Sequence, residues 1–483
     1  MNWIEQHIRN LAKTSGFEEA DAKRLFVRKL HVSIDVELRS NRTYRLAFIY
    51  AVNLLSRIFP SLTFDELPAS KLPILPWTGN KPLGALEHPE LTVHFGKGSA
   101  HEAFVTANCH RWHVLIDSPH SPTAEEEWNP VLALLTACYA TGRACKLLLG
   151  DALAGRGLYE PFSILDFDRG EVEFDWSRDS DIGHVTSAGI GAIGSAFLFA
   201  LASHGMASGR LSLVDHDLLD RPNLCRYSFF TEEEIGTMKV LSAKRRLDSQ
   251  GMQLEVKQFG QRFETYFDEN YDRDPRFRVE QLISAPDRRD TRRRFQAKLP
   301  RRLWDASTGS NQVVLHHNDY DPRLACLTCI YPETPDENAH LRHVADALNL
   351  PLERILSGAS ITTADASAIH SKYPQLAVED VIGKEFDSVF RQLCSASEIR
   401  TGASQSVLAP LSFVSAIAGV LLYFEFIKSL NPEVFGSFQL YNYSYLDPLT
   451  NPNPSFRRLK NRSSDCVCAN PRYRKVFADI WHQ

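Results

Sequence analysis

The sequence has little of what marks secreted, membrane-bound or nucleic-acid-binding proteins. Its N-terminus, MNWIEQHIRNLAK, lacks the basic-then-apolar order of a signal peptide. Nine cysteines scattered over 483 residues do not form the dense pattern of a disulfide framework. The formal net charge of −5 argues against a general nucleic-acid-binding role. We therefore expect a cytoplasmic protein with reduced thiols that binds no nucleic acid.

Long apolar runs without charge are also scarce. The run from Val407 to Phe424 could nearly cross a bilayer by length. Pro410 and two serines interrupt it, Glu425 follows at once, and no basic cluster flanks it. This pattern predicts a helix buried against a sheet, and we expect no membrane association.

The first part of the chain lacks glycine where a nucleotide would need it. After an amphipathic helix expected over residues 1–30, strands and helices alternate up to about residue 165, which indicates a parallel α/β domain. Helices are expected over Tyr44–Phe59 and Pro130–Leu149. The first strand–helix turn reads RSNRT, so a phosphate could not approach its backbone closely. We expect this domain to bind no nucleotide.

The segment from His184 to Lys239 has what the first part lacks. An apolar strand runs into Gly189, Gly191 and Gly194, and a helix follows. The first glycine allows a tight turn, the second lets a phosphate approach, and the third lets the helix pack on the strand. A second strand then ends at Asp215 and Asp217, where an acidic residue can hold ribose hydroxyls.

Three polar residues downstream distinguish this unit from a dehydrogenase. Asn223, Arg226 and Lys239 follow the second strand. Two cations and an amide suit a triphosphate, which carries several negative charges, whereas a nicotinamide site has no use for them. The alternative is a dinucleotide-binding unit in which the three residues coincide by chance.

The pattern D-x-D…N-L-x-R…G…K resembles the ubiquitin-activating and ThiF/MoeB adenylyltransferase family. The resemblance implies that Asp215 and Asp217 belong to an ATP site and that Asp215 binds the ribose. It also implies that Asn223, Arg226 and Lys239 contact the phosphates. A later aspartate, Asp287 in LISAPDRRDTRRR, would approach the phosphates and their Mg²⁺.

The closing helices of the two halves indicate an internal repeat. NPVLALLTACYATGRACKLLLGD and APLSFVSAIAGVLLYFEFIKSL both begin near a proline, run through small and apolar residues and contain a late lysine. We expect two Rossmann-like, ThiF-type adenylation domains in tandem, an inactive one over residues 1–170 and an active one over 171–483. Two unrelated α/β domains are the alternative.

Residues 334–406 break the α/β alternation and predict short helices inside the second domain. By the resemblance, activating enzymes carry a catalytic cysteine in this insertion, and Cys394 is the candidate. The thiolate is the nucleophile, so Arg391 or Arg400 could help to lower its pKa. The alternative for Cys394 is a half-buried structural thiol.

Two cysteine pairs suggest a structural zinc site. Cys326 and Cys329 form one pair, and Cys466 and Cys468 form the other. Short paired spacings let two turns present four thiolates to Zn²⁺. The second pair is CxC rather than CxxC, and two unlinked reduced pairs are the alternative.

The remaining clusters predict less specific roles. The stretch CHRWH at 109–113 is expected to be a polar strand edge rather than a metal site. The arginine-rich run from Arg288 to Arg302 predicts a solvated helix or a partner surface. Cys225 is expected to pack near the phosphate motif, and the cysteines of the first half are expected to lie in the core; these are Cys109, Cys138 and Cys145.

The resemblance implies an ATP-dependent activating enzyme for a ubiquitin-like protein with a C-terminal glycine. Arg226, Lys239 and Asp287 would align and neutralise the phosphates. Cys394 would take the acyl group as a thioester and pass it to a conjugating enzyme, as in a bacterial antiphage conjugation system. A sulfur-carrier adenylyltransferase of the ThiF/MoeB type and a non-catalytic scaffold are the alternatives. The oligomeric state, a homodimer included, and any arginine of the first half that completes the ATP site (Arg39, Arg42 or Arg45) are left open.

Overall fold

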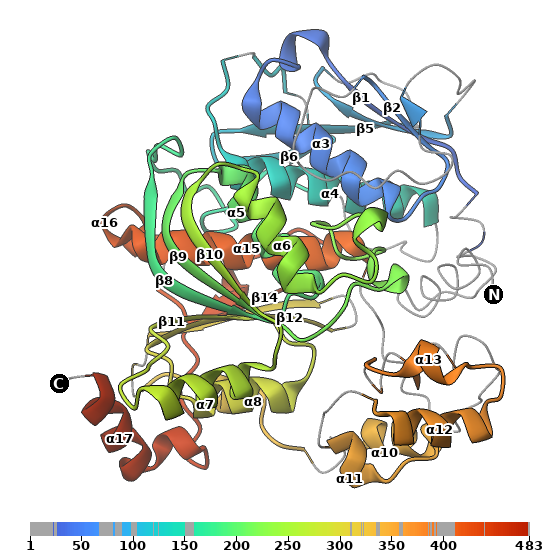
Figure 1. The fold of residues 1–483 in the computed structure, drawn as a ribbon. Coiled ribbons are helices and arrows are strands. Elements are labelled where there is room, and N and C mark those ends of the chain that lie inside the picture. Colours follow the sequence, from blue (N-terminus) through green and yellow to red (C-terminus); the bar gives the residue numbers. More distant parts are fainter. Residues whose placement is uncertain are drawn as a thin grey trace.

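The chain forms two α/β halves in the computed structural model (Figure 1). The structure describes residues 27–66, 81–82, 89–97, 104–118, 120–123, 125–149, 159–309, 312–319, 321, 323–334, 339–356, 361–384, 411–438 and 440–481, with residues 23, 386, 389–390 and 393. The helix expected over residues 1–30 lies almost entirely outside this part of the chain.

Each half is built on one mixed sheet. The first sheet has the order β3-β2-β1-β4-β5-β6-β7, with β1 Leu30–Ile34, β2 Leu62–Phe64, β3 Lys81–Pro82, β4 Leu91–Phe95, β5 Phe104–His110, β6 His113–Ile116 and β7 Phe162–Ser163. The second has the order β10-β9-β8-β11-β12-β13-β14-β15, with β8 Ser180–Ala188, β9 Ala207–Val214, β10 Gln253–Phe259, β11 Gln281–Ser284, β12 Arg302–Gly309, β13 Gln312–Asn318, β14 Tyr443–Leu446 and β15 Arg457–Arg458.

The two sheets share one topology. In the first, β3, β2, β1, β4 and β5 are parallel, and β6 and β7 continue antiparallel. In the second, β10, β9, β8, β11 and β12 are parallel, and β13 and β14 continue antiparallel. The predicted tandem of α/β units is therefore confirmed, and the closing helices of the two halves occupy the same place in this order.

Four apolar helices join the halves (Figure 1). Helix α3 (Arg42–Ser56) packs on α4 (Pro130–Leu149), α5 (Ala192–His204) packs on α15 (Ser412–Leu430), and α4 contacts both α5 and α15. Their buried side chains belong to one continuous hydrophobic cluster. Gly419 permits the close approach of α15 to α5, because a Cβ there would lie 2.4 Å from the carbonyl oxygen of Ile193.

Residues 412–424 of the predicted apolar run lie in α15. Helices α4 and α15 are both long and apolar enough to cross a membrane by length and composition, but 83% and 89% of their most apolar windows are buried inside the protein. Helices in a protein core can be equally long and apolar. Helix α15 packs on β12 and β13. The described part of the run therefore lies in a helix buried against a sheet, as predicted.

The helical insertion forms a lobe beside the second sheet (Figure 1). Its helices are α10 (Ala339–Leu348), α11 (Leu352–Leu356), α12 (Thr363–Lys372) and α13 (Val378–Val381). They enclose a hydrophobic cluster of their own. Helix α13 ends at Val381, and Gly383 follows with a φ of +78°. Cys394 lies outside the described residues.

The remaining helices cover the second sheet and the C-terminal segment. They are α6 Lys239–Asp248, α7 Phe263–Arg273, α8 Arg289–Ala297, α9 Leu327–Ile330, α16 Pro432–Phe435 and α17 Pro471–Trp481, with short 3-10 turns at Val36–Leu38, Arg221–Asn223, Glu232–Glu234, Gly436–Phe438, Pro454–Phe456 and Val467–Ala469.

Candidate nucleotide-binding site

The glycine loop lies between the end of β8 and the start of α5. Gly189 has a φ of +92°, and a Cβ there would lie 2.7 Å from the carbonyl oxygen of Ala285. A Cβ on Gly194 would lie 2.1 Å from the carbonyl oxygen of Gly189, so the loop can fold this tightly only with glycine at both positions. Gly191 caps α5 and leaves space, since the nearest atom to its Cβ would be the Tyr227 hydroxyl at 3.7 Å. The N-terminus of α5 thus offers backbone N–H groups to an anion.

Asp215 holds this loop in place. It follows β9 directly, and its Oδ2 accepts a hydrogen bond of 2.5 Å from the backbone N–H of Ile190. Its Oδ1 accepts one of 2.9 Å from the N–H of Asp217. Burial raises the pKa of Asp215, and the nearby Lys239 ammonium opposes that rise. Each carboxylate oxygen keeps a second lone pair, which a ribose hydroxyl could use.

Lys239 places a buried positive charge beside the two aspartates. Lys239 is the first residue of α6. Its Nζ pairs with the Asp217 carboxylate and lies 5.3 Å from the centre of the Tyr227 ring. Burial by itself would lower the pKa of Lys239, but Tyr227, Asp215 and Asp217 together raise that pKa well above its usual value. The lysine is therefore charged at neutral pH, as phosphate binding requires.

Asn223 and Arg226 lie on the turn that follows β9. The amide oxygen of Asn223 accepts a hydrogen bond of 3.1 Å from the N–H of Asp220 and so shapes the turn. Arg226 is half-buried, and its Nε is buried without a hydrogen-bond partner among the residues that the structure describes. A buried N–H donor of this kind fits an anionic ligand, because leaving it unpaired costs free energy.

Asp287 lies on the loop after β11, which runs parallel to β8 in the sheet. Its side chain is exposed. Since the carboxyl ends of parallel strands meet at one edge, the structure brings this carboxylate to the edge that holds the glycine loop.

One arginine of the helix after Asp287 departs from the predicted solvated helix, while Arg289 and Arg294 are exposed. Arg292 on α8 is only 3% exposed. It pairs with the buried carboxylate of Asp305 and donates to the carbonyl oxygen of Pro286. Asp305 also accepts hydrogen bonds from Ser284 Oγ at 2.6 Å and from the Tyr331 hydroxyl at 2.9 Å. Arg292 therefore anchors the loop that carries Asp287 from the protein interior, a role that the composition of the run did not indicate.

The first half supports the turn that carries Asn223 and Arg226. Arg57, at the end of α3, is 1% exposed. Its guanidinium donates to the carbonyl oxygens of Leu224 and, at 3.0 Å, Phe230, and its Nε donates to Asn53 Oδ1 at 2.8 Å. Burial lowers the pKa of Arg57 to about 9, which still leaves the guanidinium charged at neutral pH. Asn53 Nδ2 adds a bond of 3.0 Å to the carbonyl oxygen of Ser228.

Arg57→Met is expected to destabilise the protein and to impair ATP use. It leaves buried carbonyl oxygens without their donors, at a cost of ~1–3 kcal/mol each. The displaced turn should lower kcat/KM for ATP by ~10-fold or more, because small misplacements of binding groups are costly. Thermal unfolding and ATP-dependent pyrophosphate exchange measure the two effects. Arg143→Ala, which removes a 2.6 Å pair with Asp117 elsewhere in the first half, is the matched control. Normal ATP kinetics in Arg57→Met would contradict the supporting role.

The first half retains one counterpart of the nucleotide site. Asp65 follows β2 as Asp215 follows β9, and its Oδ2 accepts a hydrogen bond of 3.0 Å from the N–H of Ile34, at the end of β1. In this half, however, Arg39 donates to the same oxygen at 3.0 Å, and His31 Nε2 lies 3.5 Å from the other oxygen. The sequence analysis missed Asp65, although the strand SLTFD ends in aspartate as LSLVD does.

The three arginines considered for the ATP site lie on or beside α3. Arg39 pairs with Asp65, and the Arg42 guanidinium lies 4.1 Å from the centre of the Trp128 ring. Arg45 is half-buried in the first turn of α3. Arg39 and Arg42 therefore have partners within the first half.

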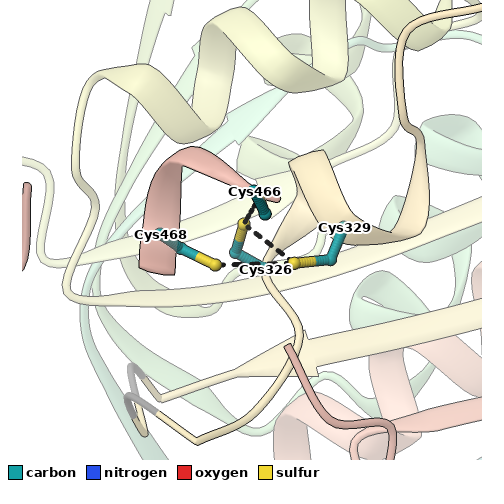
Figure 2. A group of neighbouring side chains, drawn as sticks. All are labelled: Cys326, Cys329, Cys466 and Cys468. Carbon is teal, nitrogen blue, oxygen red and sulfur yellow. Dashed lines mark hydrogen bonds between the residues drawn. The ribbon is translucent and has the colours of Figure 1, made fainter. Parts of the chain in front are cut away.

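The four paired cysteines converge (Figure 2). Cys326 and Cys329 lie at α9, and Cys466 and Cys468 lie at a 3-10 turn before α17. The Sγ–Sγ distances are 3.9 Å for Cys326–Cys329, 3.6 Å for Cys326–Cys466 and 3.4 Å for Cys329–Cys468. A tetrahedral Zn–S length of about 2.3 Å implies a sulfur–sulfur spacing of about 3.8 Å. The donor set and spacing thus fit zinc.

The environment of these thiols favours thiolate formation at two positions. Hydrogen bonds from Cys326 lower the pKa of Cys329, and they lower that of Cys466 to about 7. The N–H of Ser463 also donates to Cys329 Sγ at 3.4 Å. Thiolates are the form that binds zinc.

The other cysteines that the structure describes are buried or half-buried, as predicted. Cys109, Cys138 and Cys145 are buried in the first half. Cys225 is half-buried within the phosphate motif, and burial raises its pKa.

The glycine loop, the acid after the second strand and the buried lysine define the class of this protein, which is a nucleotide-binding α/β protein with an adenylation-type phosphate motif. The ThiF family model matches residues 180–469, which is more than half of the chain. The chain belongs to the ThiF family. This membership supports adenylyltransferase chemistry at the site.

The individual proteins that follow share little sequence identity with this chain. The uncharacterized protein y4jF of Sinorhizobium fredii (strain NBRC 101917 / NGR234) is 26% identical over 262 residues, which are 51% of this chain and 49% of that protein. The match thus spans about half the length of this curated relative. A crystal structure of E. coli MccB with ATP aligns over 76% of this chain and 98% of that chain, with 13% identity and a TM-score of 0.36. E. coli MccB with MccA-N7isoASN aligns over 60% of this chain and 67% of that chain, with 15% identity and a TM-score of 0.35. We draw nothing about function from structural likenesses this distant.

Proposed function

We propose that this chain uses ATP to activate the C-terminal glycine of a ubiquitin-like protein. The observation that carries the proposal is the arrangement around Asp215, whose carboxylate holds the tight glycine loop and lies near the buried Lys239. The turn after β9 adds Arg226, whose Nε has no hydrogen-bond partner among the described residues. This set provides fixed positive charge and backbone donors for a polyphosphate.

The proposed reaction needs alignment and charge neutralisation rather than a strong base. The carboxylate of the partner attacks the α-phosphorus of ATP, the bond from that phosphorus to the bridging oxygen of the β-phosphate breaks, and pyrophosphate leaves. Because the nucleophile is already an anion, the site has only to hold it in line and to stabilise the charge that develops. Arg226 and Lys239 would supply that charge, and Asp215 would orient the ribose.

Asp287 is the residue that would hold Mg²⁺. An exposed carboxylate oxygen at the edge of the sheet suits this hard cation, which would neutralise phosphate charge when bound. The four-cysteine cluster would hold a structural Zn²⁺, as its donor set and spacing support.

The first half would act as an inactive partner domain. The pairing of Asp65 with Arg39 supports this proposal, since the guanidinium occupies a carboxylate oxygen that a ribose would otherwise use. This domain would contribute by holding the turn that carries Asn223 and Arg226, through the hydrogen bond from Arg57 to the carbonyl oxygen of Leu224.

The second proposed step is transfer to Cys394. The thiolate sulfur attacks the carbonyl carbon of the acyl-adenylate, the bond to the phosphate oxygen breaks, AMP leaves and a thioester forms. A conjugating enzyme would then receive the acyl group. A cytoplasmic antiphage conjugation system remains our proposal for the setting.

Cys394→Ala is expected to keep pyrophosphate exchange and to lose the thiol-sensitive adduct with the partner, because only the second step needs the thiolate. Incubation with ATP and a candidate ubiquitin-like protein, followed by electrophoresis with and without a reductant, measures the adduct. Cys225→Ala is the matched control, since burial raises the pKa of that thiol and disfavours its thiolate.

The outcomes separate the alternatives. An adduct that survives in Cys394→Ala but not in Cys225→Ala would move the role to Cys225. Adenylate formation without a thioester in the wild-type protein would favour a ThiF/MoeB-type enzyme for a sulfur carrier. Partner binding without pyrophosphate exchange would favour a non-catalytic scaffold.

A further inference from the structure

Three metal-ligating side chains converge in the first half, far from the cysteine cluster in sequence. They are His110 at the end of β5, His120 in the connection that follows β6, and Glu126 four residues before α4. One ligand atom from each lies within 4.8 Å of the others. We propose that His110, His120 and Glu126 bind a divalent transition-metal cation, with Zn²⁺ the cation that the ligand set suits best.

The spacing of the ligand atoms supports a shared cation. His110 Nδ1 lies 3.0 Å from Glu126 Oε2, and His120 Nε2 lies 3.8 Å from Glu126 Oε1. The two imidazole rings lie with their centroids 5.3 Å apart and their planes tilted by 45°. Two ligands bound at about 2.0–2.1 Å in a tetrahedral arrangement lie about 3.3 Å apart, so a small adjustment brings all three to one ion.

One atom of this cluster lacks a partner without such an ion. His120 Nε2 is buried and makes no hydrogen bond with the residues that the structure describes. Its distance of 3.8 Å from the Glu126 oxygen exceeds a hydrogen bond. Burial lowers the pKa of His120, which favours the neutral imidazole that a metal requires.

The ligand set is that of an open zinc site. Two imidazoles and one carboxylate leave a fourth position for water. The His110 side chain is 45% exposed, so solvent can reach this position, whereas the Glu126 side chain is only 10% exposed. The Arg111 guanidinium does not occupy the cluster, because it pairs with Glu171 at 2.7 Å.

This assignment differs from what the stretch CHRWH suggested. Cys109 is buried in the core, and His113 Nδ1 lies 3.8 Å from Glu171 rather than in the cluster. Only His110 of that stretch takes part, and its fellow ligands come from the next connection.

A cation here would fix the start of α3. The backbone carbonyl oxygen of Glu126 accepts a hydrogen bond of 2.8 Å from Asn41 Nδ2, and that of Glu127 accepts one of 2.6 Å from Thr43 Oγ1. Asn41 caps α3 through the N–H groups of Thr43 and Tyr44. The proposed site would therefore tie the end of β5 to the connection that holds this helix.

The test is the zinc content of full-length protein equilibrated with Zn²⁺ and freed of excess metal. His120→Ala and Glu126→Gln should each hold about one Zn²⁺ fewer per chain than the wild type. His113→Ala, in the same hairpin but paired with Glu171, should hold as much as the wild type. Cys326→Ser should lose a different ion and keep this one. Equal zinc in the wild type, His120→Ala and Glu126→Gln would overturn the proposal.

Cobalt substitution adds a measurement on the wild-type protein, which does not depend on the folding of any variant. Wild-type protein titrated with Co²⁺ should show ligand-field bands from a nitrogen–oxygen site in addition to any thiolate charge-transfer band. The first bands should persist in Cys326→Ser and vanish in Glu126→Gln. Only thiolate-type absorption in the wild type would show that the triad is held by hydrogen bonds alone.

Discussion

Lys239→Ala is expected to lower partner-dependent pyrophosphate–ATP exchange by ~10²-fold or more, the usual effect of removing preorganised charge from a transition state. Lys239 is 4% exposed, and its ammonium is held against Asp217 and the Tyr227 ring. Without it, the carboxylates of Asp215 and Asp217 would lose the buried ammonium that offsets their charge, and Arg226 alone would remain of the two proposed phosphate-binding cations. Radiolabelled pyrophosphate incorporation into ATP, in the presence of the partner, measures the effect.

A control on the same helix separates chemistry from folding. Lys244→Ala removes a lysine whose side chain is 30% exposed and which pairs with Asp248 at 2.7 Å, four residues along α6; it should leave exchange unchanged. Removing one partner of a buried pair can itself destabilise a protein by ~3–5 kcal/mol, so circular dichroism and thermal unfolding should accompany the Lys239 measurement.

Asp287→Ala and Arg226→Ala should also lower exchange by ~10²-fold or more. Asp287 is exposed, so its replacement should leave the unfolding transition as it is in the wild type. Near-normal exchange in Asp287→Ala would show that another carboxylate serves the metal. Near-normal exchange in Lys239→Ala would refute the proposed phosphate site.

Cys329→Ser is expected to remove about one Zn²⁺ per chain and to lower the Tm by roughly 5 °C or more, because the binding energy of a structural zinc is coupled to folding. Cys329 Sγ lies 3.4 Å from Cys468 Sγ, and the cluster joins α9 to the turn before α17. Atomic emission spectroscopy and thermal unfolding measure the two effects.

Other contacts of the C-terminal helix limit the damage to that region. Trp481 Nε1 donates a hydrogen bond of 3.0 Å to the carbonyl oxygen of Leu299. Helix α17 should keep this contact with the rest of the protein when the metal is lost. Cys145→Ala removes a buried thiol outside the cluster and should retain all zinc, which makes it the matched control. If wild-type protein without zinc at the cluster were fully stable, the four cysteines would not form a structural zinc site.

Local sequence determined much of the fold and the nucleotide motif. The helix expected over Pro130–Leu149 has these bounds in the structure, because Pro130 suits the first position of a helix and a long apolar run follows it. Gly189 and Gly194 could be recognised because only glycine permits their contacts, and Asp215 because it follows a strand at a known spacing. These signals lie within one strand–turn–helix unit. The paired cysteines could be recognised as well, since thiolate pairs have few other uses.

Tertiary structure alone decided the contacts between distant segments. In the sequence, nothing distinguishes Arg57 from other arginines that follow an apolar helix. Only the packing of the two halves brings its guanidinium to the carbonyl oxygen of Leu224. The composition of the arginine-rich run predicts exposed side chains, yet Arg292 is buried because it pairs with the buried carboxylate of Asp305. His120 and Glu126 join His110 only because β5, β6 and the start of α4 fold back on each other. Sequence periodicity reports the neighbours along one element, whereas these contacts depend on which faces of separate elements meet, and burial of apolar surface selects those faces.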